Sequence, residues 1–175
     1  DGVKIRGKGV NYRPGTMSGI GYIGMELFEA FVELGLKVTI VEFAPFVLPV
    51  FDNDISKLIQ QQLASISRTR FEILTSELVT ELFSNEQGEV VGFKTGTGKE
   101  FNTDMVVICT GVKPNVEFAY DSGIALGETG AIKVNKHMRT NIQNIYAFCD
   151  CAEKNLIIDG SNVWISLCST YNKTA

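Results

Sequence analysis

Three glycines and one acid between residues 19 and 42 have the types and the spacing that chemistry on a bound ligand would need. Gly19, Gly21 and Gly24 form the pattern G-x-G-x-x-G. In a dinucleotide site the first glycine permits a tight turn, the second lets the backbone approach a pyrophosphate, and the third lets a helix pack close to a sheet. The N-terminus of that helix presents free N–H groups and the positive end of its dipole to the phosphates. The pattern therefore predicts a phosphate-binding turn.

Glu42 lies about 20 residues beyond the glycines, where a carboxylate accepts hydrogen bonds from the ribose hydroxyls of NAD. Phe43 follows it, so no Arg or Lys stands there to pair with a 2′-phosphate, which the carboxylate would repel. This favours NAD(H) over NADP(H) as the cofactor. A solvated acid at the end of a strand is the alternative interpretation of Glu42.

The residues after the glycines predict a helix and a strand in the order that such a site requires. Residues 22–34 carry apolar side chains at helical spacing, and Gly35 follows where a glycine commonly ends a helix. Residues 37–42 predict a short buried strand. A glycine-rich turn that binds nothing is the alternative, which this ordered context disfavours. The apolar positions of the helix are Ile23, Leu27, Ala30, Phe31 and Leu34.

The stretch before the glycines is a poor match to the first strand of a dinucleotide fold. Residues 11–17 read N-Y-R-P-G-T-M, and a proline lacks the N–H that a central strand donates. We therefore expect residues 1–17 to form an irregular lead-in, with at most a weak strand near residues 10–12.

The rest of the chain predicts further helix and strand, interrupted by a meander. The turn at 110–115, T-G-V-K-P-N, follows a buried strand, and open α/β sheets bind ligands at such carboxyl ends; a plain Gly-Pro loop is the alternative. The fold class is therefore α/β: a Rossmann-like three-layer dinucleotide-binding domain with an inserted antiparallel β-meander. The expected elements are a helix from Asp52 or Asn53 to about residue 67 and strands at 71–74, 78–85, 89–95, 99–102 and 103–109.

Composition excludes several classes of protein. The 175 residues suit one domain, or one and part of another. A net charge of −4 and the lack of a basic cluster argue against a nucleic-acid partner. No apolar run approaches the ~20 residues of a membrane span, and no signal peptide opens the chain. We expect a cytoplasmic protein that binds neither nucleic acid nor a membrane.

Metal-binding and nucleophilic side chains do not cluster in the sequence. Cys109 lies in an apolar strand pattern and is interpreted as a small buried hydrophobe. Cys149-x-Cys151 lacks the usual spacing of metal ligands, and the single histidine, His137, lies in a polar stretch. No nucleophile–base pair can be recognised. We expect reduced thiols, no metal site and no catalytic residue in this chain, so that bound cofactors carry the chemistry.

With these motifs the chain resembles the pyridine nucleotide–disulfide oxidoreductase family, and within it the coenzyme A-disulfide reductase and NADH oxidase branch. The resemblance covers about residues 18–173. It implies an enzyme whose FAD domain is split by an inserted NAD(P)H domain. Hydride would pass from NADH to FAD and then, as electrons, to a disulfide, a thiol or dioxygen. The matching segments are residues 21–26, 38–42, 110–115, 127–134, 144–147 and 149–152, with further matches from Val163 to Lys173.

The resemblance also implies roles for segments and residues. Residues 18–130 would be the NAD(H)-binding domain, and residues 131–175 a partial return into the FAD domain, where Asp150 would contact FAD. Glu26 would lie near the nicotinamide or, alternatively, act as an acid favoured by the helix dipole. Tyr22 would cover the nicotinamide face or pack in the core. The residues expected to bind NAD are Gly19, Gly21, Tyr22, Ile23, Gly24, Glu26, Glu42, Thr110 and Gly111.

The sequence lacks several features of the family and replaces one of its glycines. The glycine motif of the FAD domain, the redox cysteine and the dimer domain are absent, so we expect a fragment that is inactive alone, or an isolated nucleotide-binding fragment without turnover. Cys149 replaces the family's glycine beside Asp150, and its side chain would crowd a flavin. The apolar runs 144–148 and 163–167 would leave surface uncovered, so we expect a homo-oligomer.

Overall fold

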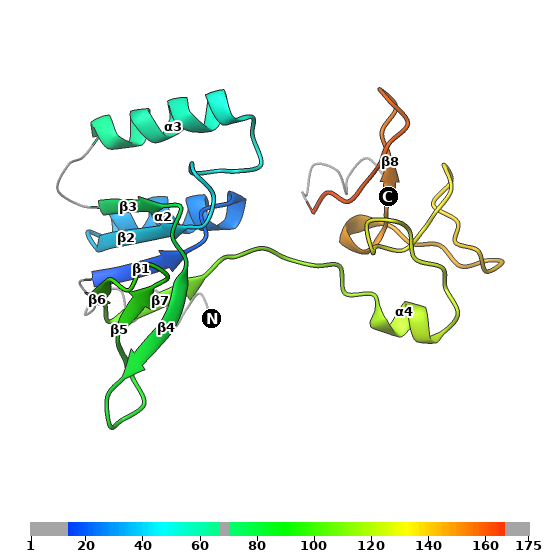
Figure 1. Ribbon diagram of the computed structural model, residues 1–175. Helices are drawn as coiled ribbons and strands as arrows, with labels where there is room; N and C mark the ends of the chain where they lie inside the picture. Colours follow the sequence, from blue (N-terminus) through cyan, green and yellow to red (C-terminus); the bar gives the residue numbers. More distant parts are fainter. Residues whose placement is uncertain (1–13, 67–70, 167–175) are drawn as a thin grey trace. The chain divides into compact units, whose positions relative to one another are not determined.

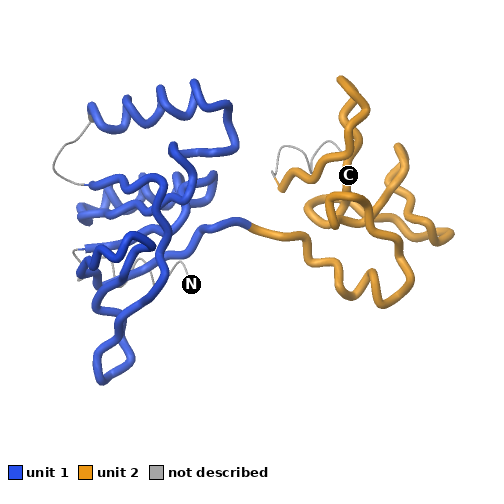
Figure 2. Tube along the Cα trace, viewed as in Figure 1, with its two compact units in different colours: residues 1–111 blue, residues 112–175 orange. Residues whose placement is uncertain are grey.

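The computed structural model describes residues 14–66 and 71–166 of the chain (Figure 1). It divides into two compact units, residues 1–111 and residues 112–175 (Figure 2). This division falls 19 residues before the boundary that we expected after residue 130. The assignment of the two units to an NAD(H) domain and an FAD domain stays a prediction.

A four-stranded parallel sheet forms the centre of the first unit. Its order is β3-β2-β1-β7, so β1 is central and pairs with both β2 and β7. In register, Gly15 lies opposite Val38 on one side and Met105 on the other. The prediction of a Rossmann-like α/β fold is confirmed. The strands are β1 (Pro14–Ser18), β2 (Lys37–Glu42), β3 (Phe71–Thr75) and β7 (Met105–Ile108).

The expectation of an irregular lead-in up to residue 17 is wrong for its last residues, which form β1. Pro14 is the first residue of the strand, a position where a missing N–H is tolerated. Thr16 is 1% exposed, and its hydroxyl donates to the Thr103 hydroxyl at 3.0 Å, so the buried polar group is satisfied. The weak strand expected near residues 10–12 lies outside the described residues.

Helix α2 (Tyr22–Glu33) packs on the sheet through a face that only partly matches the expected one, which included Phe31 and Leu27 of the observed core. Its buried residues are Gly24, Phe28 and Phe31, which follow one another at spacings of four and three. Ile23 is 54% exposed, and Ala30 and Leu34 are also exposed. The close approach of Gly24 to the Gly19 carbonyl selects this face, because no side chain fits between the helix and the glycine turn there.

Helix α3 (Asn53–Ile66) covers the same core. Ile59 and Leu63 are half-buried and pack against the cluster that contains Phe31 and Ile40. The Ser56 hydroxyl donates to the Leu48 carbonyl at 2.9 Å and ties the start of the helix to the preceding loop. No helix among the described residues is long and apolar enough to cross a membrane.

The expected meander is present as β4 (Val79–Ser84), β5 (Val90–Thr95) and β6 (Glu100–Asn102), paired antiparallel in that order. Phe93 is fully buried and stacks on Phe101, which lies opposite it in register, with ring centroids 5.0 Å apart. The Thr103 amide donates to the Val91 carbonyl at 3.1 Å. These contacts attach the meander to the entrance of β7.

The second unit holds little regular structure around a small core. Its elements are α4 (Glu117–Asp121), a 3-10 turn η1 (Cys149–Cys151), and the two-residue strands β8 (Lys154–Asn155) and β9 (Asn162–Val163). The apolar runs 131–134 and 144–148 contribute only isolated bridges such as Ile132↔Ala152 and Arg139↔Tyr146. Its core residues are Val116, Ala119, Ile124, Ile132, Ala147 and Ala152.

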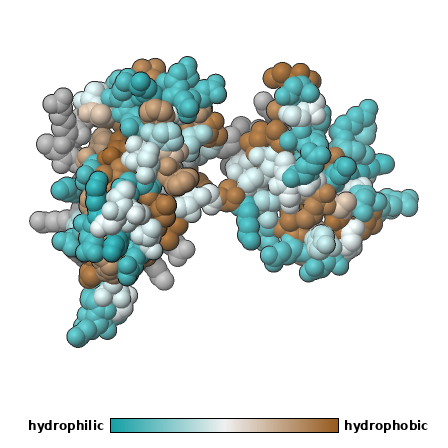
Figure 3. Space-filling model, in the orientation of Figure 1, coloured by the Kyte–Doolittle hydropathy of each residue, from teal (hydrophilic) through white to brown (hydrophobic). Residues whose placement is uncertain are grey.

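Large apolar side chains reach the surface of this second unit, as the brown areas of Figure 3 illustrate. Phe118 and Tyr120 of α4 are exposed, and so are Tyr146 and Phe148 of the run 144–148. Residues 167–175, which include the last residue of the apolar run 163–167, lie outside the described residues. Self-association of the chain stays a prediction that this exposed surface motivates.

The buried face of α2 can be tested with a pair of substitutions on the same helix. Phe31 is 1% exposed, so Phe31→Ala should lower the free energy of unfolding by about 3–5 kcal/mol. Ile23→Ala removes a side chain that is 54% exposed and should change it by only about 0.5 kcal/mol. Urea unfolding followed by circular dichroism measures both. Equal losses in the two variants would contradict the observed helix face.

Candidate dinucleotide site

A pocket of about 320 Å³ lies at the carboxyl ends of β1, β2 and β7. This is the edge at which open α/β sheets bind ligands. The pocket brings together Gly19, Gly21, Glu42, Thr110 and Gly111, which are five of the nine residues expected to bind NAD. Its lining is completed by Ser18, Val41, Phe43, Pro49, Glu77, Leu78 and Cys109.

The other four expected residues lie on the first turns of α2, outside the lining of this pocket. Tyr22 is 41% exposed and meets Phe51 edge-on, with ring centroids 6.0 Å apart. Ile23 and Glu26 are exposed, and Gly24 is buried. Tyr22 therefore does not pack in the core, and its contact with a cofactor stays a prediction, as do those of the other three.

The three glycines of the motif serve different purposes. Gly19 has a φ of +90°, and a Cβ added there would lie 2.4 Å from the Cys109 carbonyl oxygen. A Cβ on Gly24 would lie 2.4 Å from the Gly19 carbonyl oxygen, so the protein's own packing requires both glycines. A Cβ on Gly21 would meet nothing within 4 Å. The packing of this unit therefore leaves open space at Gly21, beside the pocket.

The carboxylate of Glu42 is held by backbone amides of the glycine turn and of the loop after β2, a role that its position in the sequence did not indicate. Its side chain is 7% exposed. One carboxylate oxygen accepts from the Ile20 amide and the other from the Ala44 amide, each at 2.9 Å. A carboxylate has about four lone-pair sites, so acceptor capacity remains for hydroxyl donors in the pocket. Glu42 thus shapes the glycine turn, and its contact with a cofactor stays a prediction.

Backbone hydrogen bonds join the glycine turn to its neighbours. The Gly19 amide donates to the Val41 carbonyl at 2.8 Å, and the Cys109 amide donates to the Ser18 carbonyl at 2.7 Å. These bonds connect the ends of β2, β1 and β7 into one rim. The partial burial of Cys109 raises the pKa of its thiol through desolvation, so the thiol in this rim favours its neutral form.

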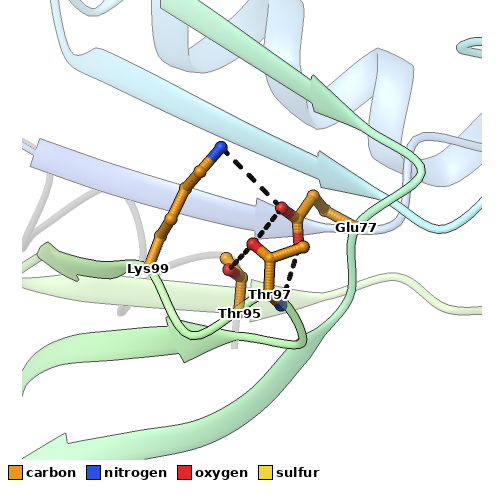
Figure 4. A network of polar contacts seen from close by, with 4 residues as sticks. All are labelled: Glu77, Thr95, Thr97 and Lys99. Carbon is orange, nitrogen blue, oxygen red and sulfur yellow. Dashed lines mark hydrogen bonds and ion pairs between the residues drawn. The ribbon is translucent and has the colours of Figure 1, made fainter.

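Glu77 is a pocket residue that sequence reasoning missed. It is 8% exposed and lies between β3 and β4. Its carboxylate accepts from the hydroxyl and the amide of Thr97, and the Lys99 ammonium lies 4.0 Å away (Figure 4). The hydrogen bond from the Thr97 side chain lowers the pKa of the Glu77 carboxyl below its ordinary value. No local pattern marks the residue, because its partners lie 20 residues further along the chain.

Asp150, the residue expected to contact FAD, lies in η1 of the second unit and is exposed. Cys149 before it has a φ of +65°, in the left-handed region that glycine adopts most easily. Lys154 is buried and its ammonium donates to the Cys149 carbonyl at 3.0 Å, which helps to hold this turn. The role of Asp150 toward FAD stays a prediction.

The sequence of residues 16–169 matches the family model described as pyridine nucleotide-disulphide oxidoreductase. The chain is 38% identical over 156 residues to the CoA-dependent NAD(P)H sulfur oxidoreductase of Pyrococcus furiosus, covering 89% of this chain and 34% of that protein. It is 38% identical over 136 residues to the NADH oxidase of Methanocaldococcus jannaschii, covering 77% of this chain and 29% of that protein. The chain therefore spans about a third of the length of these curated relatives.

Solved structures also resemble this chain. The NAD-dependent persulfide reductase from A. fulgidus superimposes with a TM-score of 0.87 at 31% identity, covering 98% of this chain and 31% of that one. The reduced CoADR-RHD of Bacillus anthracis superimposes with a TM-score of 0.87 at 30% identity, covering 98% of this chain and 29% of that one.

Because the space around Gly24 and around Gly21 differs, an added methyl group should destabilise the chain to a different extent at each. Gly24→Ala places a methyl group against the Gly19 carbonyl and should lower the free energy of unfolding by about 1–3 kcal/mol. Gly21→Ala meets open space at the helix N-cap and should cost less than about 1 kcal/mol. Denaturant unfolding of the two variants beside the parent chain measures the difference. A loss for Gly21→Ala as large as that for Gly24→Ala would contradict the assignment.

The lowered pKa of Glu77 predicts a dependence of stability on pH. Its ionised carboxylate contributes stability above the ordinary pKa of 4.5, and this contribution is lost as pH falls through the lower pKa of the folded chain. Below pH 4.5 the free energy of unfolding should therefore fall more steeply for the parent chain than for Glu77→Gln, which cannot ionise. Unfolding curves at stepped pH test this, with Glu81→Gln on exposed β4 as the control. Parallel slopes for parent and Glu77→Gln would refute the assignment.

Proposed function

Because this chain belongs to the pyridine nucleotide-disulphide oxidoreductase family, we propose that its first unit binds NADH in the pocket beside Gly21 and Glu42. We further propose that the second unit is part of an FAD domain. In the full-length protein hydride would pass from NADH to FAD and on to a disulfide, a thiol or dioxygen. This is the chemistry of a coenzyme A-disulfide reductase or of an NADH oxidase.

The observation that carries the proposal is the open space at Gly21. Gly19 and Gly24 lack side chains because the protein's own backbone lies against them, whereas Gly21 faces no protein atom within 4 Å of an added Cβ. A pyrophosphate that approaches the backbone there would occupy that space. Gly21 is also the N-cap of α2, and no side chain caps this helix, so its first amides can donate to the phosphates.

The charge of the pocket supports NADH over NADPH. Glu42 and Glu77 both line it, and no Arg or Lys is among the described residues of the lining. A 2′-phosphate beside Glu42 would meet a buried carboxylate with no cation to offset it. The ribose hydroxyls of NADH would instead donate to that carboxylate.

A nucleotide-binding fragment without turnover of its own is the second candidate. It is favoured because the chain spans about a third of its curated relatives, so most of an FAD domain and the acceptor site lie outside it. In this chain the residues bind and orient the nucleotide, and FAD, when bound by the full-length protein, supplies the electron acceptor for the hydride. Exposed Asp150 is the residue of this chain that would contact FAD.

The proposed function is tested by calorimetric titration of the full chain with NADH and with NADPH, beside an absorbance scan for bound flavin. We expect the Kd for NADH to be at least about tenfold lower than that for NADPH, which corresponds to ~1.4 kcal/mol. Gly21→Ala should weaken NADH binding by about tenfold or more, because its methyl group occupies the space of the pyrophosphate. A folded parent chain that binds neither nucleotide would refute the proposal.

A further inference from the structure

Glu77 carries an inference that rests on the proposed function and extends it. We propose that Glu77 is a positioning residue of the dinucleotide pocket: its carboxylate, held by Thr97 and Lys99, fixes the segment 76–78 so that Leu78 forms one wall for the adenine ring. Four observations support this role: the partners of the carboxylate, the rigidity of the turn that supplies them, the backbone bonds of the segment, and the apolar surface beside it.

The carboxylate of Glu77 is anchored to the turn between β5 and β6. The Thr97 hydroxyl donates to one carboxylate oxygen and the Thr97 amide to the other, at 3.4 Å for the amide. Lys99 adds an ammonium group at 4.0 Å from the hydroxyl-bonded oxygen. Figure 4 shows Thr95, Thr97 and Lys99 converging on Glu77 from this turn. A buried carboxylate with charge-assisted partners is a strong attachment point.

The turn that holds Glu77 is itself ordered. The Thr95 amide donates to the Lys99 carbonyl and the Gly98 amide to the Thr95 carbonyl, both at 2.9 Å. The hydroxyls of Thr95 and Thr97 lie 3.1 Å apart and share a hydrogen bond. The carboxylate therefore binds to a fixed partner rather than to a free side chain.

The segment that carries Glu77 is pinned between β2 and the meander. The Ser76 amide donates to the Ala44 carbonyl at 3.0 Å, and the Glu77 amide donates to the Glu42 carbonyl at 3.1 Å. The Gly96 amide donates to the Leu78 carbonyl at 3.0 Å. The backbone thus links Glu77, the neighbour of Leu78, to Glu42, whose carboxylate holds the glycine turn.

The apolar part of the pocket lies beside this segment. Phe43 is 75% exposed and Leu78 is 44% exposed, and both line the pocket with Pro49. When the pyrophosphate lies at Gly21 and the ribose at Glu42, the remaining part of the nucleotide that needs apolar walls is the base. Phe43 and Leu78 supply these walls, because an aromatic base gains from burial against apolar side chains. Fixing Leu78 therefore fixes the base site.

Four chains separate positioning from general stability: the parent, Thr97→Val, Thr97→Ser and Thr80→Val. Thr97→Val removes the hydroxyl donor to Glu77 at nearly constant shape, and Thr97→Ser keeps it. Thr80→Val is the matched control, because Thr80 lies on β4 of the same meander, its hydroxyl donates to the Lys94 carbonyl, and it does not line this pocket. The probes are NADH and ADP-ribose, which shares the adenine half and lacks nicotinamide. Kd values are measured by calorimetry well below the melting temperature of each variant.

Thr97→Val should raise the Kd of NADH and that of ADP-ribose by the same factor, about fivefold. Thr97→Ser and Thr80→Val should leave both Kd values within about twofold of the parent. Suppose that the parent binds NADH and that Thr97→Val binds both probes as tightly as the parent does. This result would overturn the positioning role and leave the proposed function standing. A loss for NADH without a loss for ADP-ribose would overturn it too, because the effect would then lie outside the adenine half. Failure of the parent to bind NADH would instead refute the proposed function.

Discussion

The close approach of helix α2 to strand β1 is the constraint on which the first unit depends. An added Cβ on Gly24 would lie 2.4 Å from the Gly19 carbonyl oxygen, which leaves no room for a side chain between helix and turn. This contact places Phe28 and Phe31 in the core, one and two turns further along the helix. It also aims the N-terminus of α2 at the carboxyl edge of the sheet, where the pocket opens. Core packing and the geometry of the ligand site thus follow from one contact.

Buried carboxylates give the pocket its shape as well as its charge. Glu42 accepts from the amides of Ile20 and Ala44 and so joins the glycine turn to the loop after β2. Glu77 accepts from Thr97 and so joins the segment after β3 to the turn between β5 and β6. A buried acid that lost these donors would keep unsatisfied acceptor oxygens, which is unfavourable away from water. Both carboxylates therefore have roles in the fold beside the glycine turn. Under the proposed function the same two groups would also disfavour a 2′-phosphate.

The parts of the fold that local signals encode could be predicted, and the parts that depend on distant partners could not. The glycine spacing predicted the turn and helix α2, and turn residues predicted the meander, because glycines and alternating side chains act within a few residues. Strand β1 escaped prediction because Pro14 argued against a central strand, whereas the proline occupies its first position, and the Thr16 hydroxyl finds its partner on Thr103, 87 residues away. The buried face of α2 was predicted in part: Phe31 and Leu27 pack in the core, whereas Ile23 is exposed because close contact places Gly24 against the glycine turn. Glu77 has no local signature, since burial and the Thr97 bond exist only after the meander folds back.

The described residues that line the pocket come from one of the two units. Every residue of that lining, from Ser18 to Gly111, belongs to the first unit. The parallel sheet, α2 and the segment 76–78 position all of them. If the pocket binds NADH as proposed, the contacts to the nucleotide would come from the first unit. Hydride transfer would also require an acceptor next to the nicotinamide, which in the proposed function is FAD, and the chain spans about a third of the length of its curated relatives. Turnover would therefore depend on parts of the full-length protein beyond this chain.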